Sequence, residues 1–277
     1  TLHSGNQFPH DLRAWMAQSV LKIPESKLRI ISPDMGGSFG LRSSCFPELT
    51  LVLWAAKQLD RPVKWINERS DGILEEHARD FHMAVELALD KNGKFLGLRV
   101  TKNASVGAYL NNFGPLPAFG NFGGVAGVYK TPAISATITG VFTNAAPTSP
   151  YRGAGRPEAT LAIEQVIDLA GREMGIDRIE LRRRNIIPPD AFPYQTALTY
   201  NYDSGEFERN MNRALEMADA ASFEARRAKS KANGKLRGLG IANAIEQAAG
   251  MFDEGGEIRF DQEGHITVLM GTHAHGQ

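Results

Sequence analysis

The sequence is poor in cysteine and has no long apolar run. One cysteine, Cys45, occurs among the 277 residues, so an internal disulfide and a multi-cysteine zinc or iron–sulfur ligand set are excluded. No apolar stretch reaches the ~18 residues that a membrane-spanning helix needs, and the first residues lack the charged and apolar regions of a signal peptide. We therefore expect a cytoplasmic protein.

An excess of charge of one sign is also absent. The 31 basic residues balance 31 acidic residues, which gives a formal net charge of zero. Such a chain has no general attraction for nucleic acids or anionic membranes, so a charged ligand has to be recognised locally. We expect neither nucleic-acid nor membrane partners.

Hydrophobic periodicity predicts a chain in which strands and helices alternate. It places helices at residues 9–21, 47–59, 157–174, 177–185, 207–217 and 222–232, and strands at 1–4, 28–31, 63–66, 83–89, 95–104, 134–142 and 266–270. An Asn92-Gly93 turn joins two of these strands into a hairpin, and the glycine- and proline-rich residues 107–127 are expected to be irregular. The pattern indicates the α+β class (mixed α/β), with mixed sheets that helices cover.

Two glycine-rich segments stand next to these elements. The first glycine loop, Asp34–Gly40, lies between an expected strand and an expected helix, where backbone amides can approach an anion or a flat cofactor closely. The second glycine loop, Tyr151–Arg156, immediately precedes another helix. The first loop lacks the Gly-Lys-Ser/Thr ending of a phosphate-binding P-loop and the spacing of a Rossmann fingerprint, so neither nucleotide motif applies.

Four motifs, taken in order, resemble the molybdenum-cofactor-binding large subunit of the xanthine dehydrogenase, aldehyde oxidase and carbon monoxide dehydrogenase family. That family has a Gln after its first strand, a Gly-Gly-x-Phe-Gly loop, a Tyr/Phe-Arg-Gly-x-Gly loop that opens a helix, and a Gly-Thr-x-x-x-Gly-Gln loop. The similar residues here are Gln7, Gly36–Gly40, Tyr151–Gly155 and Gly271–Gln277.

The resemblance implies part of a larger subunit. Residues 1–277 would form the first molybdopterin-binding domain, with a subdivision into 1–142 and 143–277 as a further expectation. A small N-terminal domain and a C-terminal cofactor domain would lie outside the chain.

The resemblance also implies an activity. The complete subunit would be a molybdopterin-dependent oxidoreductase that converts an aldehyde or heteroaromatic C–H to C–OH with water as the oxygen source. It would hold molybdenum on molybdopterin in its cytosine dinucleotide form, and electrons would pass to iron–sulfur clusters and FAD on partner subunits. The isolated chain would be inactive.

The resemblance further assigns site residues. No protein atom would ligate the metal, and the residues expected to bind the cofactor are Gln7, Gly37, Phe39, Gly40, Arg152, Gly153, Gly276 and Gln277. The family's catalytic Glu would lie beyond Gln277, so the catalytic residue is unassigned. Glu48, Glu158 and Glu246 lie near the loops but do not fit the family's motif.

Departures from the family's patterns narrow the expected substrate. Xanthine-oxidising members have Glu, Arg and Phe where this chain has Ser43, Gly120 and Ala154, which disfavours a purine. Copper-using members have Arg-Cys-Ser-Phe-Arg where this chain has Arg152–Arg156, so the cysteine that bridges to copper is absent. An aldehyde or a heteroaromatic ring is the expected substrate class.

Other interpretations of the same residues remain open at the level of sequence. Gln7 could merely end a strand, Phe39 could fill a core, and Arg152 could pair with Glu158 or cap a carbonyl. His273 and His275 could be metal ligands, although a third ligand is not evident. The chain as a whole could be a non-catalytic or split module for cofactor binding or assembly, or, least favoured, a phosphate-binding hydrolase.

Overall fold

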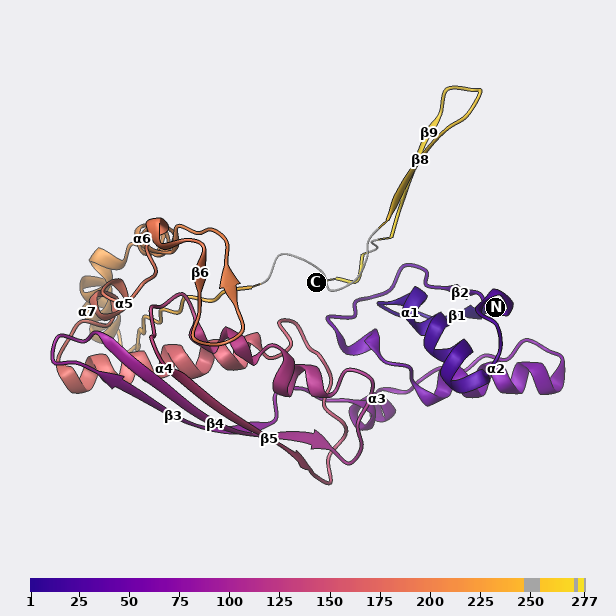
Figure 1. The fold of residues 1–277 in the computed structure, drawn as a ribbon, viewed down its shortest axis with the longest axis horizontal. Coiled ribbons are helices and arrows are strands. Elements are labelled where there is room, and N and C mark those ends of the chain that lie inside the picture. Colours follow the sequence, from indigo (N-terminus) through magenta and orange to yellow (C-terminus); the bar gives the residue numbers. More distant parts are fainter. Residues whose placement is uncertain (247–254, 272–273, 277) are drawn as a thin grey trace.

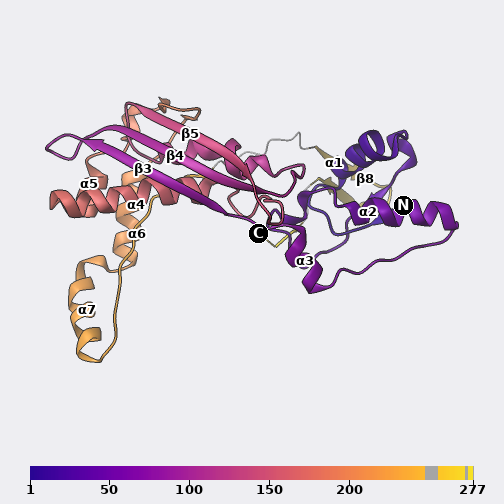
Figure 2. The same ribbon diagram turned by 90° about the horizontal axis from the view of Figure 1, so that it is seen from below.

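The computed structural model describes residues 1–246, 255–271 and 274–276, and Figure 1 shows their arrangement. An N-terminal group of elements lies on one side, a sheet with its helices lies on the other, and a hairpin projects away from both. The same two groups are separate when the molecule is viewed from below in Figure 2.

The N-terminal group is built on two short parallel strands, β1 (Leu2–His3) and β2 (Ile30–Ile31). The chain between them forms α1 (Pro9–Ala14), which continues as a π-helix over Trp15–Leu21. Helix α2 (Pro47–Leu59) begins at a proline, which suits a first turn because the missing N–H would have no helical partner there. The apolar residues of these elements form one core, made of Leu2, Leu12, Met16, Ala17 and Leu28, with Leu49, Val52 and Leu53 packed against it.

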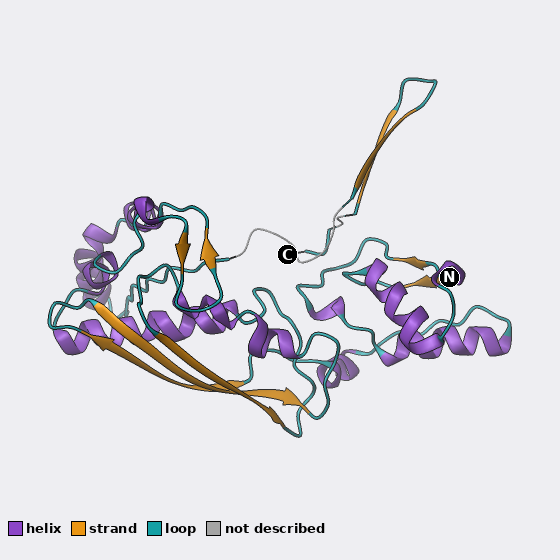
Figure 3. Cartoon of the chain, viewed as in Figure 1, coloured by secondary structure: helices purple, strands orange, loops and turns teal. Residues whose placement is uncertain are grey.

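The second group contains a three-stranded mixed sheet of β3 (Phe81–Leu89), β4 (Phe95–Gly107) and β5 (Ile134–Phe142). Strand β4 pairs antiparallel with β3 and parallel with β5. Helix α4 (Arg156–Met174) runs along one side of the sheet, and Figure 3 shows the helices gathered on that side. Along β3, half-buried and exposed residues alternate because only one face of the sheet is covered. The main core joins the sheet to the helix through Phe95, Leu98, Val100, Ile163 and Ile167.

The remaining elements are shorter. They are α3 (Arg69–Glu75), α5 (Arg178–Arg183), β6 (Tyr194–Gln195), β7 (Asn201–Tyr202), α6 (Phe207–Met217), α7 (Phe223–Ala232), β8 (Gly256–Phe260) and β9 (Ile266–Met270). Short 3-10 or π turns occupy Glu25–Lys27, Leu41–Ser43, Leu116–Gly120, Phe122–Ala126, Pro189–Ala191 and Ala220–Ser222. Within the described residues, none of the helices combines the length and apolar character that a membrane crossing requires.

The expected α+β class with mixed sheets is confirmed, and most expected elements form. Asp177 caps α5 as expected, because its Oδ1 accepts hydrogen bonds from the backbone N–H groups of Ile179 and Glu180. The strand expected at 63–66 is wrong. No described strand pairs with this segment, and Ile66 is 71% exposed, so it has neither the hydrogen-bonded neighbour nor the burial that a strand needs.

Positions before and after residue 142 contribute to the same main core. Ile134 and Ile138 of β5 pack there together with Ile163 and Ile167 of α4. The domain limits given above, including the subdivision at 142, stay a prediction.

A buried charge network ties α4 to α5. The fully buried Arg182 donates to Glu164 Oε2 at 2.8 Å and to Asp168 Oδ1 at 2.7 Å. The Tyr129 hydroxyl donates to the other Glu164 oxygen at 2.6 Å. Burial, together with the charge of Glu164, raises the pKa of Tyr129, so this hydroxyl keeps its proton and remains a donor. The network satisfies a carboxylate that would otherwise be buried without a partner.

Replacing Arg182 by Met is expected to lower the free energy of unfolding by about 3–5 kcal/mol, because Glu164 would then be a buried charge without its cation. Urea unfolding of the purified protein measures the change. The control is Arg209→Met, which removes the exposed Arg209–Glu206 pair and should leave stability almost unchanged. Equal stabilities for the two variants would contradict this account.

Candidate cofactor site

The first glycine loop adopts backbone conformations that favour glycine. Gly37 and Gly40 have φ values of 121° and 99°, and Phe39 between them has a φ of 56°. A non-glycine residue in this left-handed region is strained, so the surrounding contacts must hold Phe39 there. The consequence is that the Phe39 ring and the adjacent backbone are presented in one fixed orientation.

Gln7 is fixed against this loop by its side-chain oxygen. Gln7 Oε1 accepts hydrogen bonds from Ser38 Oγ at 2.6 Å and from the Gly40 backbone N–H at 3.0 Å. A backbone N–H can only donate, so the oxygen of the amide has to face Gly40 and the orientation of the amide is determined. Within the described residues the Gln7 Nε2 group makes no hydrogen bond, which leaves two N–H donors for a ligand.

The second glycine loop lies directly against the first. The Arg152 backbone N–H donates to the Phe39 carbonyl at 2.8 Å, and the Arg152 guanidinium carbon lies 5.9 Å from the centre of the Phe39 ring. A Cβ atom on Gly40 would lie 2.5 Å from the Pro150 carbonyl oxygen, so only glycine permits this approach. The two loops, far apart in the sequence, therefore form one surface.

The second loop is also held from its other side. The Arg79 guanidinium donates to the Arg152 carbonyl at 2.6 Å and lies 4.8 Å from the centre of the Tyr151 ring. Gly153 and Gly155 have φ values of 93° and 101°, and Gly155 is the N-cap of α4. The loop thus presents backbone at a helix N-terminus, which favours anionic groups.

A segment near the end of the chain completes the arrangement. The Ser38 backbone N–H donates to the His275 carbonyl at 2.8 Å. Gly276 lies beside the first loop, because a Cβ atom built on it would be 3.1 Å from the Gly37 Cα and 3.2 Å from the Phe39 ring. Gln277 and His273 lie outside the described residues.

The geometry thus places together most of the residues expected to bind a cofactor. Seven of the expected residues are described. Five belong to the two glycine loops, and the other two, Gln7 and Gly276, lie against the first loop. The seven are Gln7, Gly37, Phe39, Gly40, Arg152, Gly153 and Gly276. Sequence reasoning missed Ser38 and Arg79. Arg79 comes from the segment before β3, and no local pattern links it to the loop that it supports.

The structure contradicts two of the simpler interpretations, namely that Gln7 merely ends a strand and that Arg152 pairs with Glu158. Gln7 makes specific hydrogen bonds to the first loop, and so does more than end a strand. The exposed Arg152 pairs with no carboxylate among the described residues, Glu158 included. Within that same part of the chain, no three or more His, Cys, Asp or Glu side chains are grouped to hold a metal ion.

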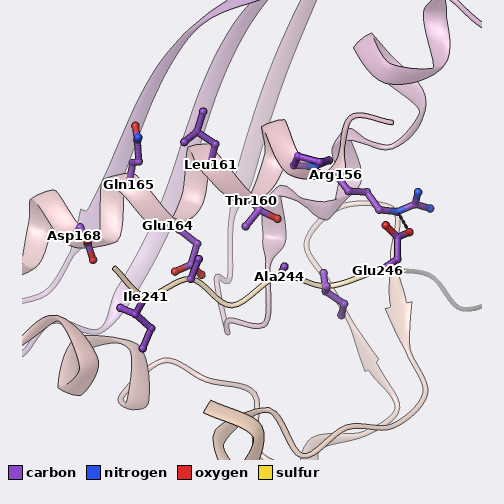
Figure 4. A pocket seen from close by; sticks show the side chains of 12 residues that line it. Arg156, Thr160, Leu161, Glu164, Gln165, Asp168, Ile241, Ala244 and Glu246 are labelled. Carbon is purple, nitrogen blue, oxygen red and sulfur yellow. Dashed lines mark ion pairs between the residues drawn. The ribbon is translucent and has the colours of Figure 1, made fainter. Parts of the chain in front are cut away.

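A separate groove of about 480 Å³ lies along α4, and Figure 4 shows the side chains that line it. It is bounded by α4 residues from Arg156 to Asp168 and by residues 241–246. An ion pair of 2.9 Å between Arg156 and Glu246 lies at one end. Apart from Arg156 the glycine loops do not line it, so we place the candidate cofactor site on the loops.

The loop residues suit a large polar cofactor. Such a group is bound through backbone amides, side-chain amides and a cation, and here these are supplied by the glycine loops, the Gln7 amide and Arg152. The glycines leave room for close approach to the backbone. The fold and these loops define a cofactor-binding protein whose site is lined largely by backbone.

Comparisons with known proteins agree with this class. Two family models, each described as a molybdopterin cofactor-binding domain, match residues 1–186 and 213–277. The chain is 35% identical over 280 residues to the gamma subunit of the 6-hydroxypseudooxynicotine dehydrogenase complex of Paenarthrobacter nicotinovorans, a match that covers 99% of this chain and 35% of that protein. It is also 35% identical to the carbon monoxide dehydrogenase large chain of Hydrogenophaga pseudoflava, and this match covers 100% of this chain and 37% of that protein.

A solved structure has the same fold. Quinoline 2-oxidoreductase from Pseudomonas putida 86 superposes with a TM-score of 0.90 at 30% identity, over 99% of this chain and 37% of that one. The chain therefore belongs to the molybdenum-cofactor-binding family of xanthine dehydrogenase, aldehyde oxidase and carbon monoxide dehydrogenase. It spans 35–37% of the length of these relatives.

Replacing Gly40 by Ala is expected to push the two glycine loops apart, because the new Cβ would collide with the Pro150 carbonyl. The backbone at position 40 also has a φ of 99°, which disfavours alanine. The left-handed conformation alone costs an alanine about 1–2 kcal/mol, and the collision adds to it. The measurement is the melting temperature by calorimetry. Gly36→Ala is the matched control, since nothing lies within 4 Å of its Cβ position and no positive φ is required. A Gly40→Ala protein as stable as Gly36→Ala would refute the close contact.

Proposed function

We propose that the chain is the cofactor-binding part of a molybdenum hydroxylase large subunit that oxidises an aldehyde or heteroaromatic C–H to C–OH, with water as the oxygen source. The observation that carries the proposal is the convergence of Gln7, Phe39, Arg152 and Gly276 on one surface. These residues come from four separate parts of the chain, and family membership supplies the cofactor class.

Each residue has a task that follows from its chemistry. When bound, the molybdenum cofactor supplies the oxygen-transfer and redox chemistry. The Gln7 amide, oriented by Ser38 and Gly40, donates hydrogen bonds to an oxygen ligand or to the substrate. Arg152 offers a cation above the Phe39 ring, and Phe39 forms a wall that excludes water. Gly37, Gly40, Gly153 and Gly276 allow the cofactor to approach the backbone, and Gln277 is proposed to join them.

The rest of the subunit is proposed to supply what these residues lack. We propose that the catalytic Glu belongs to the rest of the subunit: of the acidic candidates near the loops, Glu246 pairs with Arg156, and Glu158 is buried. The hairpin of β8 and β9 exposes apolar side chains on both strands, among them Phe260 and Met270, and so requires cover. We propose that further domains of the same subunit provide the cover and the Glu.

The proposed partners and cofactors follow from family membership. Iron–sulfur clusters and FAD on partner subunits would accept the electrons, and the cofactor would be the cytosine dinucleotide form of molybdopterin. We propose a cytoplasmic location and an isolated chain without activity. The chain's relatives include a subunit named as part of a dehydrogenase complex, which supports a multi-subunit assembly.

The proposal is tested with the full-length subunit, co-expressed with its partner subunits in a host that loads related hydroxylases. Molybdenum and pterin nucleotide are measured per protein, and dye reduction is assayed with aldehydes and with nitrogen heteroaromatics. Bound cofactor with substrate-dependent dye reduction supports the proposal. Cofactor without turnover supports the alternative, a non-catalytic or split binding or assembly module, and absence of both overturns the proposal.

Replacing Gln7 by Glu tests the role of its free amide group. The carboxylate can still accept from Ser38 and Gly40, so the fold should be kept, but it has no N–H to donate. Turnover per bound molybdenum is expected to fall by about 100-fold or more, the usual effect of removing one oriented donor. Gln165→Glu, an exposed change on α4, should leave turnover unaltered. Full activity of Gln7→Glu would remove Gln7 from the proposed site.

We expect that carbon monoxide is not a substrate, although one relative is named as a carbon monoxide dehydrogenase large chain. Neither Gly153 nor Ala154 has a thiol that could bind copper. Cys45 packs against the N-terminal core, where burial raises the pKa of its thiol. Elemental analysis should find no stoichiometric copper, and added copper and sulfide should not confer CO oxidation. Copper bound one to one with molybdenum would contradict this expectation.

A further inference from the structure

Lys102 brings a charged group into the core of the molecule. It lies on the same face of the central strand β4 as the core residues Leu98 and Val100, and only 1% of it is exposed. Burying an ammonium group costs free energy unless other groups replace the water that it loses. An apolar side chain would fill this position at lower cost, so the charge needs an explanation beyond packing.

One turn of the glycine- and proline-rich segment replaces part of that water. Lys102 Nζ donates to the carbonyl oxygens of Pro117 and Ala118, each at 3.3 Å, and lies 4.7 Å from the centre of the Phe122 ring. Within the described residues Lys102 forms no ion pair. An ammonium group has three N–H donors, so one of them remains without a protein acceptor in this part of the chain.

Glu158 has the complementary deficit. Its side chain is buried, and among the described residues Glu158 Oε2 accepts no hydrogen bond. Burial lowers the pKa of Lys102, whereas the nearby charge of Glu158 raises it. The two opposite charges therefore act on each other without being in contact.

A small cavity of about 10 Å³ is lined by both side chains. This volume is about that which one water molecule needs, and a buried water is stable where polar groups are placed to bond it. The remaining Lys102 donor and Glu158 Oε2 are such groups. The other charged side chains that line the cavity, Arg79 and Asp80, are engaged by other partners.

Both side chains lie directly behind the second glycine loop. Glu158 belongs to the first turn of α4, three residues after Gly155. A Cβ atom on Gly155 would lie 2.6 Å from the Pro117 carbonyl oxygen, which is the same oxygen that accepts from Lys102. The backbone of the loop thus rests on an oxygen that Lys102 holds in place.

We propose that Lys102 and Glu158 are positioning residues, joined by one buried water molecule, that fix the backbone of the second glycine loop for cofactor binding. The Lys102 ammonium donates to the water and the water donates to Glu158 Oε2, so each buried charge gains a partner. The consequence for the cofactor rests on the proposed function, whereas the bridge and its effect on the loop do not.

A crystal structure of the full-length subunit tests the bridge without any variant. It is expected to contain one ordered water molecule within hydrogen-bond distance of both Lys102 Nζ and Glu158 Oε2. A direct ion pair between the two side chains, or the lack of an ordered water beside them, would overturn the bridge.

A double-mutant cycle in the cofactor-free, full-length protein measures how strongly the two charges are coupled. Lys102→Met and Glu158→Gln should each lower Tm by several degrees, because each leaves the other charge buried alone. The double variant should lose clearly less than the sum of the two single losses. The control is the exposed Arg99–Glu86 pair, whose Arg99→Met and Glu86→Gln changes should be almost additive. Additive losses at Lys102 and Glu158 would contradict the pair.

Hydrogen exchange, followed by mass spectrometry in the same cofactor-free protein, reports on the loop itself. In Lys102→Met the backbone amides of residues 151–156 should exchange several-fold faster than in the wild type, while those of α1 keep the wild-type rate. Unchanged exchange in the loop, or equal acceleration in both segments, would overturn the positioning role, since a general loss of stability affects every segment.

In the cofactor-loaded complex, Lys102→Met is expected to lower kcat by about tenfold or more at unaltered molybdenum content, because small displacements of a site are costly to catalysis. An unchanged kcat would refute the consequence for catalysis. Failure of the wild-type complex to bind molybdenum would instead refute the proposed function and leave the bridge and the loop results standing.

Discussion

The backbone contact between the two glycine loops is the constraint on which the candidate site depends. The Phe39 carbonyl accepts the Arg152 N–H at 2.8 Å, and Gly40 approaches the Pro150 carbonyl more closely than any side chain would permit. One loop belongs to the N-terminal group and the other opens α4, so this contact also joins the two parts of the molecule. The site exists only where these parts meet.

The molecule separates the residues that stabilise it from those that face a ligand. Arg182 and Glu164 form a buried, fully paired network between α4 and α5. Gln7 and Arg152 keep donors that no group in the described residues uses. Unused donors on a rigid frame are suited to binding, because their orientation is fixed before the ligand arrives.

The loop conformations are strained at Phe39, which needs support from its neighbours. A site built on strained backbone is sensitive to small changes in the packing behind it.

The sequence alone determined the features that local patterns encode. The limits of α2, β5 and α6, the Asp177 cap and the hairpin turn at Gly93 follow from periodicity and turn chemistry, and the ordered glycine motifs indicated the family. Only the tertiary structure decided that 63–66 is no strand, how the Gln7 amide is oriented, and that Arg79 supports the second glycine loop. Those properties depend on which distant segments become neighbours, and the hydrogen-bond partner of a polar group is fixed only when the chain has folded.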